Sequence, residues 1–194
     1  MAGKLRLGLF GGSFDPVHNG HMQLAVAAQK ECALNKVIFI PAWQPPHKAR
    51  TLAPSKDRVK MLKLAIAPYP DFRISGFELK RKKTTFTYQT VEHFHSLYPA
   101  AKLFFLLGTD SLAELGTWKN IDILASLCTF IAGKRKGVSL KKPASLAPAV
   151  HILRKPIAPV SSTQIREYVI RGRPIKGLVP QPVYEYILHH GLYR

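Results

Sequence analysis

The sequence predicts an α/β fold, in which helices cover a doubly wound and mostly parallel sheet. Short apolar runs alternate with amphipathic helical patterns, which is typical of parallel strands joined by right-handed crossover helices. The run at 103–107 is apolar throughout, as expected of a strand buried on both faces. No linker, repeat or low-complexity segment divides the 194 residues, so we expect a single domain over residues 1–194.

Strands are expected where short apolar runs end at glycine, proline or another turn residue. In chain order these runs lie at 5–10, 37–40, 72–79, 103–107, 128–132 and 150–153, and the third is interrupted at Gly76 by an expected bulge. Helices are expected where apolar residues recur every three or four positions. They lie at 22–34, 55–67, 91–97, 121–127, 165–169 and 182–189, with Ser55 and one of Ser161, Ser162 and Thr163 as N-caps.

The composition combines an apolar share of 46% with a formal net charge of +18, from 29 Lys and Arg against 11 Asp and Glu. Such an excess attracts polyanions, namely nucleotides, nucleic acid or an acidic membrane surface, and does not choose among them. The two cysteines give no disulfide framework, which favours a reducing compartment. No apolar stretch reaches the length of a secretory core or a bilayer span, so we expect a soluble cytoplasmic protein without membrane contact.

A glycine-rich turn over residues 11–21 follows the first strand and leads into a helix start. Glycines allow backbone N–H groups to approach a phosphate. A helix start offers unpaired backbone N–H donors and the positive end of the helix dipole. The turn has neither of the common phosphate-loop patterns, G-x-x-x-x-G-K-[ST] and G-x-G-x-x-G. Instead His18 and His21 stand at i and i+3, on one side of the helix start. This pair of histidines predicts a phosphate site. The alternatives are histidines that only cap the helix and a pair of zinc ligands. Zinc needs three or four ligands, and the nearest other soft donor, Cys32, lies far along the same helix.

Three further segments follow predicted strands and therefore converge on the same edge of the sheet. A proline-rich loop after the second strand carries Lys48, the fourth strand ends at Gly108 and Asp110, and a helix start at Ser161 carries Arg166 one turn in. Lysine and arginine can bind phosphate there, arginine in a bidentate manner, and Asp110 can accept hydrogen bonds from ribose hydroxyls. Instead of binding a ligand, each segment could have a purely structural role, as a solvated loop or as a helix cap.

Two motifs resemble those of a known superfamily. Residues 11–21, Gly-Gly-Ser-Phe-Asp-Pro-Val-His-Asn-Gly-His, are similar to the signature of nucleotidyltransferases with a His-x-Gly-His motif. Residues 160–166, Val-Ser-Ser-Thr-Gln-Ile-Arg, resemble the C-terminal phosphate motif in the form typical of bacterial nicotinate-nucleotide adenylyltransferases. The resemblance implies a Rossmann-like nucleotidyltransferase fold and transfer of AMP from ATP, with Mg²⁺, to nicotinate mononucleotide, which gives deamido-NAD and pyrophosphate.

The resemblance also implies roles for individual residues. None of these roles is the binding of a metal by a side chain. Catalysis is expected of His18, His21 and Arg166. Nucleotide binding is expected of Gly11, Gly12, Ser13, Phe14, Gly20, Gly108, Asp110, Ser161, Ser162 and Thr163. Binding of the second substrate is expected of Lys48, Thr85, Thr87 and Trp118. The indole of Trp118 would stack on the cationic pyridine ring, whereas the residues alone favour a tryptophan packed in the core. The chain departs from the family at Gln89, where an acidic residue is expected.

Two other functions stay open on the sequence. A pantetheine-phosphate adenylyltransferase usually has threonine at the position of His18, and a basic nucleic-acid-binding protein would lose affinity steeply with salt. The sequence does not decide between nicotinate and nicotinamide mononucleotide as the acceptor. It also leaves open whether the chain forms a homo-oligomer and what the basic loop at 134–142 does.

Overall fold

A computed structural model shows a six-stranded sheet in which all neighbouring strands are parallel, and it describes residues 4–44, 51–134, 146 and 149–194. The strands are β1 (Arg6–Gly12), β2 (Lys36–Pro41), β3 (Phe72–Ile74), β4 (Lys102–Leu107), β5 (Cys128–Ala132) and β6 (Val150–Ile152). They lie in the order β3-β2-β1-β4-β5-β6. The predicted doubly wound parallel sheet is therefore confirmed, and the strand order reverses between β1 and β4.

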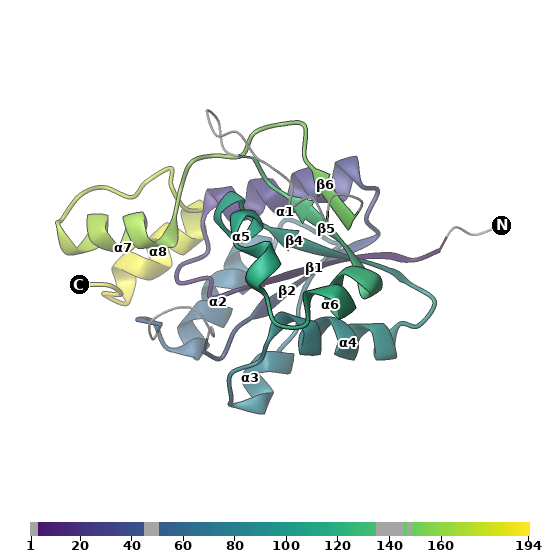
Figure 1. The fold of residues 1–194 in the computed structure, drawn as a ribbon. Helices are drawn as coiled ribbons and strands as arrows, with labels where there is room; N and C mark the ends of the chain where they lie inside the picture. Colours follow the sequence, from purple (N-terminus) through teal and green to yellow (C-terminus); the bar gives the residue numbers. More distant parts are fainter. Residues whose placement is uncertain (1–3, 45–50, 135–145, 147–148) are drawn as a thin grey trace.

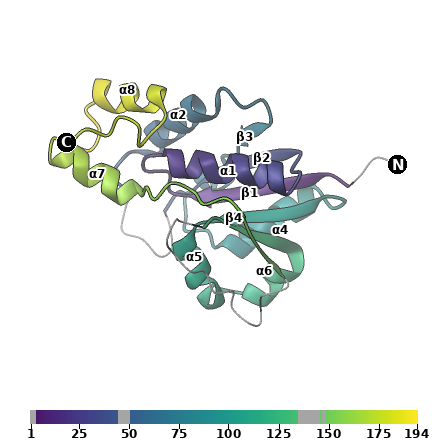
Figure 2. The same ribbon diagram turned by 90° about the horizontal axis from the view of Figure 1, so that it is seen from above.

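Helices cover both faces of the sheet (Figures 1 and 2). They are α1 (Asn19–Glu31), α2 (Ser55–Ile66), α3 (Phe77–Arg81), α4 (Thr87–Leu97), α5 (Thr109–Ala113), α6 (Ile121–Leu127), α7 (Ser162–Ile170) and α8 (Gln181–His189), with a 3₁₀ turn η1 (Leu115–Thr117). Helices α1, α2 and α8 lie on one face, and α4, α5 and α6 on the other. No helix among the described residues has the length and apolar character needed to cross a bilayer.

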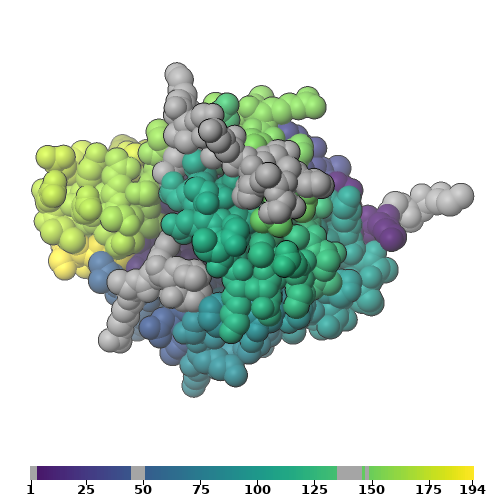
Figure 3. All heavy atoms as spheres, in the orientation of Figure 1, coloured from purple at the N-terminus to yellow at the C-terminus, as the bar shows by residue number. Residues whose placement is uncertain are grey.

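Two hydrophobic clusters fill the space between the helices and the sheet. Successive side chains of a strand point to opposite faces, and in β1 Leu7 and Leu9 join the cluster under α4 and α6 while Phe10 joins the one under α1 and α2. Helices α7 and α8 form one end of the molecule, in yellow-green and yellow, far from the start of β1 (Figure 3). Helix α8 packs on α2, which ties this end to the sheet domain.

The structure corrects one expected strand. Strand β3 ends at Ile74, and the expected continuation over 77–79 is instead the short helix α3, which begins after Gly76. The reason is not local: Glu78 is buried and accepts a hydrogen bond of 2.7 Å from Thr90 of α4, while the ring of Phe77 stacks on His93 at 3.8 Å. These contacts with α4 hold the segment in a helical turn away from the sheet edge.

Helices α1, α4 and α7 begin three or four residues before the expected positions, and α2 differs only in its cap. Helix α1 begins at Asn19 rather than at residue 22, because His18 caps it, and α7 begins at Ser162 rather than at residue 165. Helix α2 has Pro54 as its N-cap, and Ser55 is its first residue. Helix α4 begins at Thr87, before the expected residue 91. Of the three candidates for the N-cap of α7, Ser161 holds that position.

Candidate active site

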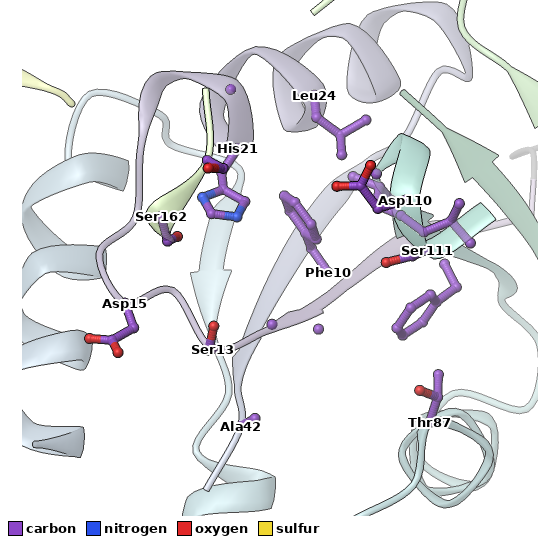
Figure 4. Close-up of a pocket in the computed structure, with 18 of the residues that line it drawn as sticks. Phe10, Ser13, Asp15, His21, Leu24, Ala42, Thr87, Asp110, Ser111 and Ser162 are labelled. Carbon is purple, nitrogen blue, oxygen red and sulfur yellow. The ribbon is translucent and has the colours of Figure 1, made fainter. Parts of the chain in front are cut away.

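A cavity of about 710 Å³ opens at the carboxyl edge of the sheet, where β1 and β4 end. Its walls include the end of β1, the start of α1, the end of β4, the segment around Thr85, the turn at Trp118 and the start of α7. In Figure 4 His21 and Ser162 lie on one side of this cavity, and Thr87 lies across it. The predicted convergence of separate loops at one edge is therefore present.

The two histidines of the first motif close the start of α1 reciprocally. The backbone N–H of His21 donates to Nδ1 of His18 at 3.3 Å, and the backbone N–H of His18 donates to Nδ1 of His21 at 3.2 Å. Their rings stack with centroids 3.6 Å apart. A neutral imidazole that accepts at Nδ1 carries its proton on Nε2. Capping and cavity lining are thus compatible, because each ring uses one nitrogen for the cap and keeps an N–H donor on the other.

Aromatic packing beneath the histidines fixes the turn of residues 11–14. The ring of Phe14 is 1% exposed and meets His21 edge-on at 5.1 Å, and Phe10 does the same at 5.7 Å. A Cβ at Gly12 would lie 3.2 Å from the Phe14 ring, so a glycine lets the chain pass over it. Phe14 is not among the residues that line the cavity, and its side chain packs beneath the turn, so nucleotide binding by its backbone stays a prediction.

Asp15 anchors the same turn to distant parts of the chain. It is 3% exposed, and its carboxylate accepts hydrogen bonds from the backbone N–H groups of Leu52 and Ala53 at 2.8 and 3.1 Å and from the hydroxyl of Tyr193 at 2.8 Å. Figure 4 shows this carboxylate pointing away from the other labelled residues. Buried Arg58 donates to the carbonyl of Ser13 at 2.7 Å. Asp15 and Arg58 were missed in the sequence because their partners lie far away along the chain.

The start of α7 meets the turn from the other side. The hydroxyl of Ser161 caps α7 by accepting from the backbone N–H of Gln164 at 3.1 Å, and the hydroxyl of Ser162 donates to the carbonyl of Pro16 at 2.9 Å. Arg166 donates to the carbonyl of Asp15 at 2.8 Å and to the hydroxyl of Thr163 at 3.2 Å. The guanidinium is therefore oriented by both motifs at once.

The opposite end of the cavity is aromatic. Trp118 is half-buried and meets Phe105 edge-on at 5.9 Å, and both residues line the cavity. Lys119 also lines it, with its Nζ 4.7 Å from the centroid of the Phe86 ring. Thr85 and Thr87 stand on either side of Phe86, the N-cap residue of α4. This end offers flat apolar surface for a ring, with one lysine beside it.

Two polar side chains at this end have structural partners. Glu78 is 8% exposed, and burial raises its pKa to about 6, although the hydrogen bond from Thr90 and the charge of Arg81 act in the opposite direction. Gln89 occupies the position where the family has an acid, and its Oε1 accepts from the backbone N–H of Phe86 at 3.2 Å. Gln89 therefore caps α4.

All the predicted site residues that the structure describes line the cavity, with the exception of Phe14. Lys48 lies outside the described residues, as does most of the basic loop at 134–142. Side chains that line the cavity but were missed include Glu78, Phe105, Ser111, Glu114 and Lys119. Lys119 carried the clearest signal, because it is a cation directly beside the tryptophan already singled out. In the part of the chain that the structure describes, no three His, Cys, Asp or Glu side chains form a metal-binding group.

Comparisons with known proteins agree on one family. The model of the cytidylyltransferase-like family matches residues 9–168. A probable nicotinate-nucleotide adenylyltransferase of Thermus thermophilus is 40% identical over 98% of this chain and 100% of its own, and one of Thermoanaerobacter sp. is 40% identical over 100% and 97%. Among solved structures, the Plasmodium falciparum nicotinic acid mononucleotide adenylyltransferase complexed with NaAD has a TM-score of 0.79 at 19% identity, covering 97% of both chains. A putative nicotinate-nucleotide adenylyltransferase from Vibrio parahaemolyticus gives 0.73 at 20% identity, covering 98% of this chain and 96% of its own.

Proposed function

The chain belongs to the cytidylyltransferase-like family and, within it, to the nicotinate-nucleotide adenylyltransferases, and on this premise we propose that it transfers AMP from ATP to nicotinate mononucleotide. The products are deamido-NAD and pyrophosphate, and the activity is a step of NAD biosynthesis. The observation that carries this proposal is the meeting of the two motifs at one cavity. Arg166 of the second motif donates to the carbonyl of Asp15 in the first.

The reaction needs no covalent intermediate with the protein. The attacking group is the phosphate of the mononucleotide, which is already an anion and needs no general base. Catalysis then consists of holding two anions in line and of neutralising the charge that grows at the α-phosphorus and on the leaving pyrophosphate. A cavity with fixed N–H donors at one end and a flat aromatic surface at the other fits these two tasks.

The triphosphate of ATP is proposed to lie between the starts of α1 and α7. Residues of both helix starts line this part of the cavity, and a helix start carries partial positive charge that favours an anion. His18 would donate from Nε2 to the α-phosphate, with His21 beside it. Arg166, held by the Asp15 carbonyl and the Thr163 hydroxyl, would bind the β and γ phosphates. Mg²⁺ is expected to enter with ATP, because it binds phosphate oxygens and shields the charge of the departing pyrophosphate.

The nicotinate mononucleotide is proposed to occupy the aromatic end. Its pyridinium ring would stack on Trp118, which the edge-on contact with Phe105 holds in place. Thr85 and Thr87 would flank the ring, and Gly108 and Asp110 would lie along the nucleotide between the two ends.

A reducing, cytoplasmic compartment completes the proposal. Cys32 and Cys128 are both buried free thiols, and burial raises the pKa of Cys128 to about 12. Such thiols behave as small apolar groups. A homo-oligomer remains a prediction, which the molecular mass of the protein in solution would test.

Pyrophosphate release tests the proposed function. Purified protein would be given MgATP together with nicotinate mononucleotide, nicotinamide mononucleotide or 4′-phosphopantetheine, each in a separate reaction. We expect release with nicotinate mononucleotide, and with one deamido-NAD formed for each pyrophosphate. Release with 4′-phosphopantetheine alone would assign the chain to the pantetheine-phosphate enzymes, and release with none of the three would overturn the proposal.

A further inference from the structure

Two buried aromatic residues with a strained backbone meet at Asp15, in the turn of the first motif. Phe14 directly precedes Asp15 and has a φ of 48°, and Tyr193 follows α8 and has a φ of 69°. Positive φ values are unfavourable for bulky side chains and persist only where surrounding contacts hold them. The hydroxyl of Tyr193 donates to Oδ1 of Asp15 at 2.8 Å, so this one contact joins the two strained positions.

Arg58 of α2 holds the same turn at Ser13. Its side chain is buried and donates to the carbonyl of Ser13 at 2.7 Å. Burial lowers the pKa of Arg58, and the negative charge of Asp15 acts in the opposite direction. The Ser13–Phe14 peptide bond is trans, so its N–H points away from Arg58. Arg58 therefore fixes the direction of a backbone group for which nucleotide binding is predicted.

The same turn also holds the second motif. The backbone carbonyl of Asp15 accepts a hydrogen bond from Arg166 at 2.8 Å, and that of Pro16 accepts from the hydroxyl of Ser162 at 2.9 Å. Asp15 thus links Tyr193, which its carboxylate binds, to Arg166, which its carbonyl binds. Asp15, Ser162 and Arg166 line the cavity, whereas Tyr193 does not. Any effect of Tyr193 on a bound ligand therefore has to pass through other residues.

We infer that Tyr193 is a positioning residue for ATP, which acts through Asp15 and together with Arg58 to hold the turn at 13–16 in the shape that places Arg166 against the triphosphate. The inference rests on the proposed function. Without the hydroxyl of Tyr193, the Asp15 carboxylate loses one of its donors and the residue can rotate, which shifts the carbonyl that orients Arg166. The affinity for ATP then falls, while the aromatic end of the cavity, where the mononucleotide is proposed to bind, keeps its shape.

Tyr186→Phe is the matched control for Tyr193→Phe. The hydroxyl of Tyr186 donates to the carboxylate of Asp57 at 2.9 Å, so each substitution takes a tyrosine hydroxyl away from a buried aspartate. Asp57 belongs to α2 and does not line the cavity. We expect the KM for ATP to rise about three- to tenfold in Tyr193→Phe and to stay at the wild-type value in Tyr186→Phe. The KM for nicotinate mononucleotide should stay within about twofold of the wild type in both variants.

Two further variants test the route through the turn. Arg58→Lys keeps the buried positive charge but moves the donor that binds the Ser13 carbonyl, so it should also raise the KM for ATP. In a double variant of Tyr193→Phe and Arg166→Lys, both substitutions disturb one contact. The rise in the KM for ATP should therefore be smaller than the product of the two single rises. Unfolded protein lowers the apparent kcat and leaves KM unchanged, so a loss of stability alone cannot produce these shifts.

Equal KM values for ATP in Tyr193→Phe and Tyr186→Phe, or a rise in the double variant that equals the product, would overturn the inference while the proposed function stands. Should Tyr193→Phe not fold, an unchanged KM for ATP in Arg58→Lys would overturn the inference and a raised one would support it. A wild-type enzyme that forms no deamido-NAD would overturn the proposed function itself.

Discussion

The hydroxyl of Tyr193 donates a hydrogen bond of 2.8 Å to the carboxylate of Asp15, which lies 178 residues earlier in the chain. Burial and the neighbouring carboxylate both raise the pKa of Tyr193, so the phenol remains a proton donor at neutral pH. This bond joins the end that contains α7 and α8 to the turn that supports the proposed ATP site.

Replacing Tyr193 by Phe removes this bond and leaves the ring in place. We expect the free energy of unfolding to fall by about 1 to 3 kcal/mol, the usual cost of a lost buried hydrogen bond to a charged group. Denaturant unfolding of Tyr193→Phe measures this change in the free energy of unfolding. The control is Tyr98→Phe, because Tyr98 is exposed. Equal midpoints for the two variants would mean that the bond contributes nothing to stability.

His18 and His21 can be tested without removing the helix cap. Asn at position 18 and Gln at position 21 are good residues for the N-cap and N3 positions, so His18→Asn and His21→Gln should preserve the start of α1. Each variant loses an imidazole donor to the triphosphate, and we expect turnover to fall by about 10² to 10⁴ with little change in the circular dichroism spectrum. Near-normal turnover in both variants would refute their role.

Arg166 should not be replaceable by Lys. A lysine carries its three donors on one nitrogen and has no planar fork, so it cannot occupy both positions from which Nη1 and Nη2 of Arg166 donate to the Asp15 carbonyl and the Thr163 hydroxyl. For Arg166→Lys we expect kcat/KM for ATP to fall about 10- to 100-fold in steady-state assays. The control is Arg171→Lys, at an exposed position at the other end of the same helix, and it should leave kcat/KM for ATP unchanged.

Glu78 makes stability depend on pH in a predictable direction. Its pKa is raised from 4.5 to about 6 in the folded protein. Between these two values the unfolded chain has already lost the proton that the folded chain still holds, so this carboxyl lowers the free energy of unfolding as the pH rises. The whole shift amounts to about 2 kcal/mol.

The free energy of unfolding of Glu78→Gln, relative to that of the wild type, should therefore increase by about 2 kcal/mol between pH 4 and pH 7. Its amide oxygen can still accept the hydrogen bond of Thr90. Urea unfolding at a series of pH values gives the difference, and the exposed Glu92→Gln on α4 serves as the control. A difference that does not vary with pH would show that Glu78 does not titrate in this range.

The sequence predicted the parts of this protein that depend on neighbouring residues. The strand at 128–132 and the helix at 121–127 have the expected bounds, because hydrophobic pattern and turn residues agree there. The sequence could point to His18, His21 and Arg166, which line the cavity, because each lies in a contiguous motif, and their catalytic roles stay a prediction. The helix at Phe77–Arg81 was mistaken for a strand because its form depends on Thr90 and His93, more than ten residues away. Asp15 was overlooked for the same reason, since its partners are Leu52, Ala53 and Tyr193.

The reciprocal cap at the start of α1 has a consequence for the orientation of the two imidazole rings. Both hydrogen bonds require an unprotonated Nδ1 on the ring that accepts. An imidazole that accepts at Nδ1 carries its proton on Nε2. The local fold of the helix start therefore decides which ring nitrogen each histidine turns toward the cavity, so a change that loosened this cap would also reorient the imidazoles.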